Sequence, residues 1–201
     1  MSNCEILGPM EYDVEDFKVE ISTDEYIRLY RDADRFIEYC KACPNYGNLW
    51  ACPPFNRDTE SELRQYEKVL LIATKITPHR EDIPIAQAQQ FIIHERKRLE
   101  KSLLEMEKEY SGRSFAFVGK CLYCAESDCT RKKGLPCRHP ELVRPSLEAY
   151  GFDMEKTASN LFGIEILWSK TGFIPEYLIL ICGFFHNYHD KEIIGLSTLL
   201  K

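Results

Sequence analysis

Residues 121–137 read Cys121-Leu-Tyr-Cys124-Ala-Glu-Ser-Asp-Cys129-Thr-Arg-Lys-Lys-Gly-Leu-Pro-Cys137, and we expect the fold to be organised around this stretch. The two residues between Cys121 and Cys124 let both sulfurs reach one metal centre, as in zinc ribbons and iron–sulfur proteins. Gly134 and Pro136 favour turns that bring Cys137 back toward the other three thiols. The stretch therefore predicts a loop that holds a metal or a cluster.

A second group of cysteines lies upstream, at Cys40, Cys43 and Cys52. Prolines and a glycine interrupt this stretch, and Pro53-Pro54 cannot continue a helix or a central strand. A loop so irregular needs something to hold it in place, and a metal would do so. We interpret all seven cysteines as ligands and the rest of the chain as their scaffold.

The totals describe a globular chain. It has 201 residues, of which 44% are hydrophobic and 29% charged, and its net charge of −6 gives no basic footprint for nucleic acid. No apolar run approaches the ~20 residues of a membrane span, and the N-terminus lacks a signal-peptide pattern. We therefore expect a cytoplasmic protein. In that reducing compartment, nine cysteines favour metal binding over a disulfide framework.

Hydrophobic patterning predicts one α+β domain spanning residues 1–201. We expect a four-stranded mixed sheet with packed helices, plus cysteine loops at residues 40–57 and 119–140. The apolar run Val69–Ala73 indicates a central strand buried on both faces. Further strands are expected at residues 115–118, 164–168 and 177–182, with a short one at 17–21, and helices at residues 22–39, 59–66, 84–110, 145–151 and 153–163.

Two of these helices matter for the site. The first begins at a capping pattern, Ser22-Thr-Asp-Glu25, and its apolar rhythm reaches Cys40, which we therefore place on its buried face. The helix over residues 84–110 is amphipathic, with one interrupted turn at Glu95-Arg96. We expect it to cover the sheet.

The cysteines allow two metal interpretations. In the first, Cys121, Cys124, Cys129 and Cys137 hold one [4Fe–4S] cluster, while Cys40, Cys43 and Cys52 hold a second cluster or an open site. In the second, the two Cys-x-x-Cys pairs form a tetrahedral zinc site and leave three cysteines unexplained. The cluster interpretation uses all seven thiols and is preferred. Basic residues within the downstream loop would offset the charge of an anionic site: Arg131, Lys132, Lys133 and Arg138.

The sequence also resembles a known family. The resemblance rests on Cys40-Lys-Ala-Cys43-Pro-Asn-Tyr-Gly-Asn-Leu-Trp-Ala-Cys52-Pro-Pro, Cys121-Leu-Tyr-Cys124, Pro136-Cys137-Arg-His-Pro140 and Pro145-Ser-Leu-Glu-Ala-Tyr-Gly151. These segments are similar to an uncharacterised family of predicted metal-binding, cysteine-rich proteins found mostly in anaerobic bacteria and archaea. The resemblance implies metal binding by these cysteines, and the anaerobic setting favours an oxygen-sensitive iron–sulfur site. It implies no reaction.

Three functions remain open at this point. The preferred one is an iron–sulfur electron-transfer or redox accessory protein, whose partner is a redox protein or a small molecule. The alternatives are a structural zinc protein that acts as an interaction module, and an enzyme with an open iron at the three-cysteine loop. No nucleotide-binding or hydrolase motif is present, so catalytic residues and oligomeric state stay unassigned. Cys4, Cys182 and His139 are weaker ligand candidates.

Overall fold

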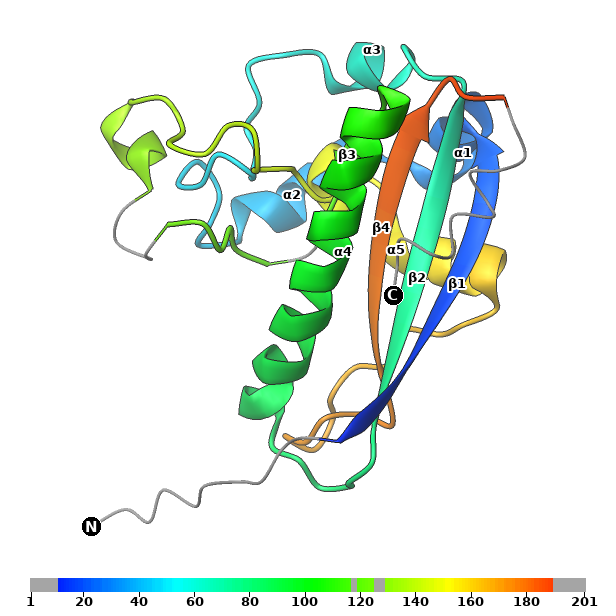
Figure 1. The fold of residues 1–201 in the computed structure, drawn as a ribbon. Coiled ribbons are helices and arrows are strands. Elements are labelled where there is room, and N and C mark those ends of the chain that lie inside the picture. Colours follow the sequence, from blue (N-terminus) through cyan, green and yellow to red (C-terminus); the bar gives the residue numbers. More distant parts are fainter. Residues whose placement is uncertain (1–10, 117–118, 125–128, 190–201) are drawn as a thin grey trace.

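A computed structural model describes residues 11–116, 119–124 and 129–189. These residues form an α+β fold with one four-stranded sheet in the order β1-β2-β4-β3. Figure 1 shows the sheet with the long helix α4 on one side and the shorter helices on the other. The strands are β1 (Tyr12–Ser22), β2 (Lys68–Pro78), β3 (Arg113–Phe115) and β4 (Leu178–His186).

The α+β class and the number of strands in the sheet are confirmed, but every pairing in the described sheet is antiparallel rather than mixed. β2 pairs with both β1 and β4, and β4 pairs with both β2 and β3. The central position predicted for Val69–Ala73 is confirmed, because this run lies inside β2 and is almost wholly buried. β4 follows all the other strands in the chain and completes the sheet by pairing between β2 and β3.

The helices lie on both faces of the sheet. Their bounds are α1 (Thr23–Tyr30), α2 (Ala33–Lys41), α3 (Thr59–Leu63), α4 (Ala88–Tyr110) and α5 (Met154–Thr157), with short 3-10 or π turns at η1 (Ile85–Gln87), η2 (Thr130–Lys133), η3 (Glu148–Tyr150) and η4 (Ala158–Phe162). Asp153 caps α5, since its side chain accepts from the backbone N–H of Lys156 at 2.9 Å. Gly163 ends this segment in the left-handed conformation.

Two hydrophobic cores follow from this layering. One lies between the sheet and α4, and includes Leu70, Ile72, Phe91, Leu99 and Phe184. The other lies between the sheet and the shorter helices, where the Tyr26 and Phe152 rings stack with centroids 4.4 Å apart. Successive residues of a strand face opposite sides, so the continuous apolar run of β2 supplies both cores.

The single helix predicted for residues 22–39 is wrong, because the structure breaks it into α1 and α2. Arg31 is extended at the break, and its guanidinium donates to the Tyr150 carbonyl at 2.8 Å and to Glu60 at 2.7 Å. Asp32 then caps α2 and donates its backbone N–H to the Gly151 carbonyl at 2.8 Å. A Cβ on Gly151 would lie 2.6 Å from the Cα of Ala33, so only glycine allows this close approach.

The predicted strand at residues 164–168 is also wrong. These residues have no regular structure: Ile166 packs on the core beside the shorter helices, and the Tyr177 hydroxyl donates to the Glu165 carbonyl at 2.7 Å. The fourth strand is β1, which is longer than the predicted residues 17–21. The acidic side chains of β1 interrupt the apolar pattern by which a strand is predicted. Two of them form ion pairs, Asp16 with Arg98 at 2.9 Å and Glu20 with Lys68 at 2.8 Å.

Some predicted features are outside the described residues or concern the membrane. Cys4, residues 117–118 of the expected strand, and the tail from Asp190 to Lys201 lie outside the described residues. Among the helices that the structure describes, none combines the length and apolar character that a membrane span requires.

An ion pair ties α4 to the segment that follows the downstream cysteines. Glu107 accepts from the Arg144 guanidinium, with the Arg144 Nε at 2.7 Å, and from the Ser114 backbone N–H at 2.6 Å. Burial alone would raise the pKa of Glu107, but the hydrogen bonds from Arg144 and Ser114 outweigh it and lower the pKa below 4.5. The ionised form is therefore the one that the fold stabilises.

Stability should depend on pH through this pair. Because the folded-state pKa of Glu107 is the lower one, its contribution is complete above about pH 4.5 and is lost as the pH falls through the folded value. We expect Glu107→Gln to cost about 1–3 kcal/mol at pH 7 and to flatten the fall in unfolding free energy below pH 5. Urea titrations across pH measure this, and Glu109→Gln on the exposed side of α4 is the control. If the unfolding free energy of Glu107→Gln falls with decreasing pH as steeply as that of the wild-type protein, this prediction is wrong.

Candidate metal site

The two cysteine loops lie side by side beyond the β3 edge of the sheet. The upstream loop leaves the end of α2 and returns at α3, while the downstream loop connects β3 to η3. Figure 1 shows both of them on the far side of α4 from β1. Segments about 80 residues apart in sequence are thus brought together at one end of the molecule, as a shared site requires.

The upstream loop is a series of tight turns. The backbone N–H groups of Cys43 and Cys52 donate to the carbonyls of Cys40 and Leu49, each at 3.0 Å, and that of Gly47 donates to Pro53 at 2.8 Å. Gly47 has a φ of 66°, the left-handed region that glycine adopts without strain. The Pro53-Pro54 peptide bond is cis. These turns set the direction of the three thiols without regular secondary structure.

Arg131 and Trp50 join the two loops. The Arg131 guanidinium donates to three carbonyls of the upstream loop, those of Leu49, Cys52 and Pro54. The Trp50 indole N–H points the other way and donates to the Leu135 carbonyl at 3.2 Å and to the Thr130 hydroxyl at 3.3 Å. The guanidinium also lies 5.3 Å from the Trp50 ring centroid, a cation–π contact. We call this set the Arg131–Trp50 clamp.

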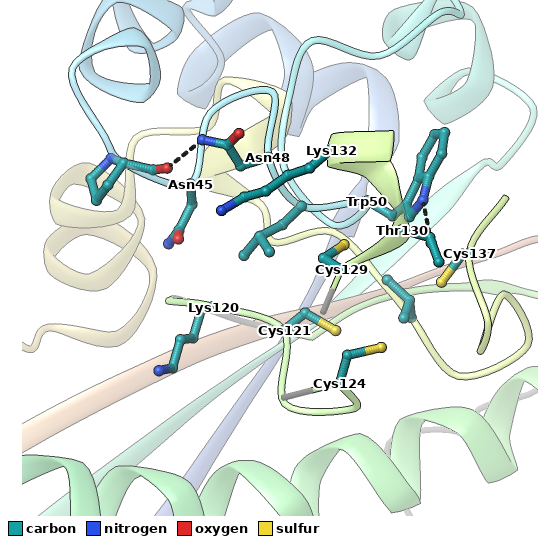
Figure 2. Close-up of a pocket in the computed structure, with 13 residues that line it drawn as sticks. Asn45, Asn48, Trp50, Lys120, Cys121, Cys124, Cys129, Thr130, Lys132 and Cys137 are labelled. Atoms are coloured by element: carbon teal, nitrogen blue, oxygen red, sulfur yellow. Dashed lines mark hydrogen bonds between the residues drawn. The ribbon is translucent and has the colours of Figure 1, made fainter. Parts of the chain in front are cut away.

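The four downstream thiols line one cavity of about 330 Å³. Figure 2 shows the sulfurs of Cys121, Cys124, Cys129 and Cys137 around a common space, with Trp50 and Thr130 beside them. The backbone N–H of His139 donates to the Cys137 sulfur at 3.4 Å, and the Arg138 guanidinium lies 4.0 Å from the Cys124 sulfur. The structure thus brings together all four residues predicted for the first cluster. Asn45, Asn48, Lys120 and Lys132 line the same cavity.

The three upstream thiols form a neighbouring group. The thiols of Cys40 and Cys43 are close enough to Cys52 to interact with it electrostatically. The Cys121 thiol of the downstream group does so as well. Cys40 is half-buried rather than buried as predicted, because α2 has no buried residue at all. In the described part of the chain, no three Cys, His, Asp or Glu side chains are close enough together to hold a single metal ion.

Several of the thiols are held in the protonated form. Burial raises the pKa of Cys52 to about 11, and the nearby thiols of Cys43 and Cys40 add to the shift, while Arg131 opposes it. Burial also raises the pKa of Cys121 and Cys40. Thiolates crowded in one place repel each other, and a bound cation removes that repulsion. The donor set therefore fits a cationic metal or cluster, whose binding would release protons.

Sequence reasoning missed a polar stripe of α4 that faces the downstream loop. Arg96 and Glu100 are buried, and the Tyr123 hydroxyl donates to Glu100 at 3.2 Å. Burial lowers the pKa of Arg96, although Glu100 and the Cys121 thiol favour its charged form. The interrupted apolar turn at Glu95-Arg96 was the available clue, because charges on a buried helix face need partners.

The weaker ligand candidates are placed elsewhere or in secondary positions. Cys182 is fully buried in the core beneath α4, where its thiol lies 3.8 Å from the Ile72 carbonyl. His139 is half-buried, and its ring centroid lies 6.1 Å from that of Tyr123. His139 therefore borders the downstream cysteines.

Comparison with known proteins gives one finding. A family model described as "Predicted metal-binding protein (DUF2284)" matches residues 27–181, a span that includes both cysteine loops. No curated protein and no solved structure matches the chain.

Proposed function

The chain belongs to this family of predicted metal-binding proteins, and on that premise we propose that it is an iron–sulfur protein of electron transfer or redox support. The observation that carries the proposal is the single cavity of about 330 Å³ lined by Cys121, Cys124, Cys129 and Cys137. These four would hold one [4Fe–4S] cluster, and Cys40, Cys43 and Cys52 a second cluster or an open site. A cluster in this place would supply one-electron chemistry.

The size of the cavity favours a cluster over one zinc ion. Four thiolates around zinc lie about 2.3 Å from the metal, so their sulfurs approach to ~3.8 Å. A cavity of about 330 Å³ has room for at least ten water molecules at ~30 Å³ each. Thiols that surround such a space suit a larger polynuclear centre.

The surroundings suit an anionic centre. Lys120 and Lys132 line the cavity, and the Arg138 guanidinium lies 4.0 Å from the Cys124 sulfur. The His139 N–H that donates to Cys137 and the positive side chains would stabilise added negative charge, which raises a reduction potential. Trp50 of the Arg131–Trp50 clamp lines the cavity as well.

Anaerobic purification followed by metal analysis tests the proposal. We expect a broad brown visible absorption that bleaches on reduction, with iron and acid-labile sulfide in equal amounts, about four of each per cluster. Zinc is counted on the same sample. A colourless protein with stoichiometric zinc and no sulfide would overturn the redox proposal in favour of a structural zinc module with a protein partner.

A further inference from the structure

A second, larger cavity is lined by none of the four downstream thiols. It measures about 950 Å³ and lies between α2, the first turns of α4, the first half of β4 and residues 166–169. Its lining is mainly apolar, with Phe36, Ile92 and Ile179 on three sides. Small-molecule sites have volumes of about 300–1,000 Å³ and are mostly apolar with a few polar groups. The cavity has both properties.

The fold keeps this cavity open. β3 pairs only with Gly183–Phe185 of β4, because Ala116 turns away and donates its N–H to the Pro145 carbonyl at 3.2 Å. Residues 178–181 therefore have β2 as their described partner on one edge only, and they line the cavity on the other. The apolar face of α2 is directed here as well, which explains why α2 has no buried residue.

One oxygen of the Glu148 carboxyl makes no hydrogen bond, although the Ser146 side chain hydrogen-bonds to the carboxyl. Glu148 lines the cavity, and its Oε2 is shielded from solvent without a hydrogen bond. The other two carboxylates in the lining are paired: Asp153 caps α5 and faces Arg35 at 3.8 Å, and Glu155 accepts the Trp168 indole N–H at 2.8 Å. A buried oxygen without a partner is costly. Since the last torsion of a glutamate is soft, a ligand in the cavity can reach a carboxyl oxygen.

We propose that this cavity binds a small, largely apolar molecule that carries a hydroxyl group, and that the hydroxyl hydrogen-bonds to Glu148. A hydroxyl both donates and accepts, so it satisfies the carboxyl in either protonation state. The exposed rings of Tyr39 and Trp168 at the rim offer further apolar area to an aromatic ligand. Glu148 lies in η3, which packs against α2, the helix that carries Cys40, so the ligand would lie next to the upstream thiols.

Calorimetric titration with two probes of equal shape tests the hydroxyl. We expect 1-naphthol to bind the full chain at least about tenfold more tightly than 1-methylnaphthalene, because the methyl group makes no hydrogen bond. Glu148→Leu should remove this preference. Equal affinities of the two probes for the wild-type protein would overturn the role of Glu148.

A matched pair of substitutions on α4 tests the location. Ile92 lines the cavity and the neighbouring Ile93 does not, although both are half-buried. Ile92→Trp should weaken 1-naphthol binding about tenfold or more, while Ile93→Trp should leave it unchanged. If Ile92→Trp does not fold, the exposed pair Gln89→Trp (lining) and Gln90→Trp (control) replaces it. Equal losses within a pair would overturn the location.

The alternative occupant of the cavity is the segment 190–201 of the chain itself. A chain that ends at residue 189 distinguishes this alternative from a bound ligand. If the full chain fails to bind 1-naphthol and a chain that ends at residue 189 binds it, the cavity belongs to the protein's own tail and the proposal is wrong. Failure of both chains to bind also overturns it. These titrations do not depend on metal, so they can fail while the iron–sulfur proposal stands, and the reverse.

Discussion

Cys124→Ser is expected to remove the metal of the downstream site. The four thiols share one cavity, so the loss of one leaves an incomplete set of thiolate ligands, and serine is a poor replacement for a soft metal ligand. Because assembly of a metal site contributes folding free energy, the melting temperature should also fall, by about 5 °C or more. Iron and sulfide analysis of anaerobically purified protein, with a thermal melt, measures both effects.

Cys182→Ala is the matched control for this substitution. Cys182 is buried in the core beneath α4, outside both cysteine loops. We expect this variant to keep its full metal content and to lose about 1 kcal/mol from the small cavity left behind. Unchanged metal content and melting temperature in Cys124→Ser would refute the downstream ligand set. Loss of metal in Cys182→Ala would refute the assignment of the seven loop cysteines as the ligands.

Arg131→Ala is expected to separate the two loops. Its guanidinium donates to three carbonyls of the upstream loop. After the substitution, water molecules cannot reproduce the charge and the fixed planar arrangement of these N–H donors. We expect a loss of about 2–4 kcal/mol in unfolding free energy. Metal content should fall in parallel, because the downstream thiols and the upstream loop line the same cavity. Urea unfolding and metal analysis measure the two effects.

The neighbouring lysine provides the control for Arg131. Lys133 is exposed on the same turn, η2, and Lys133→Ala should change stability by less than about 0.5 kcal/mol. Arg131→Lys keeps the positive charge but not the planar set of N–H donors, so it should recover only part of the unfolding free energy that Arg131→Ala loses. If Arg131→Ala and Lys133→Ala behave alike, the clamp has no energetic role.

Apolar periodicity was sufficient for the elements that bury the most surface. It predicted β2 as a central strand and the helix covering the sheet, which the structure divides into η1 and α4. Apolar periodicity failed to predict an element's end where a charged side chain bonds to residues far away in the sequence. Arg31 ends α1 because it bonds to Tyr150 and Glu60, residues that are not adjacent in sequence.

The cysteine groups could be predicted because ligand spacing is local. The four downstream thiols do line one cavity, and the three upstream thiols adjoin it. The Arg131–Trp50 clamp could not be predicted, since its acceptors are backbone carbonyls, which every sequence contains. The apolar cavity was equally hidden, because it depends on where β3 leaves β4.

The late position of β4 has a consequence for biosynthesis. All seven loop cysteines precede this strand, which alone connects β3 to the rest of the described sheet. At translation rates of about 5–20 residues per second, the 49 residues from Cys137 to His186 take roughly 2–10 s to synthesise. During that interval the nascent chain presents every one of these thiols without the scaffold that orients them. We therefore expect that any metal or cluster is inserted after β4 has been synthesised, and that a chain ending before Leu178 leaves these thiols exposed to oxidation.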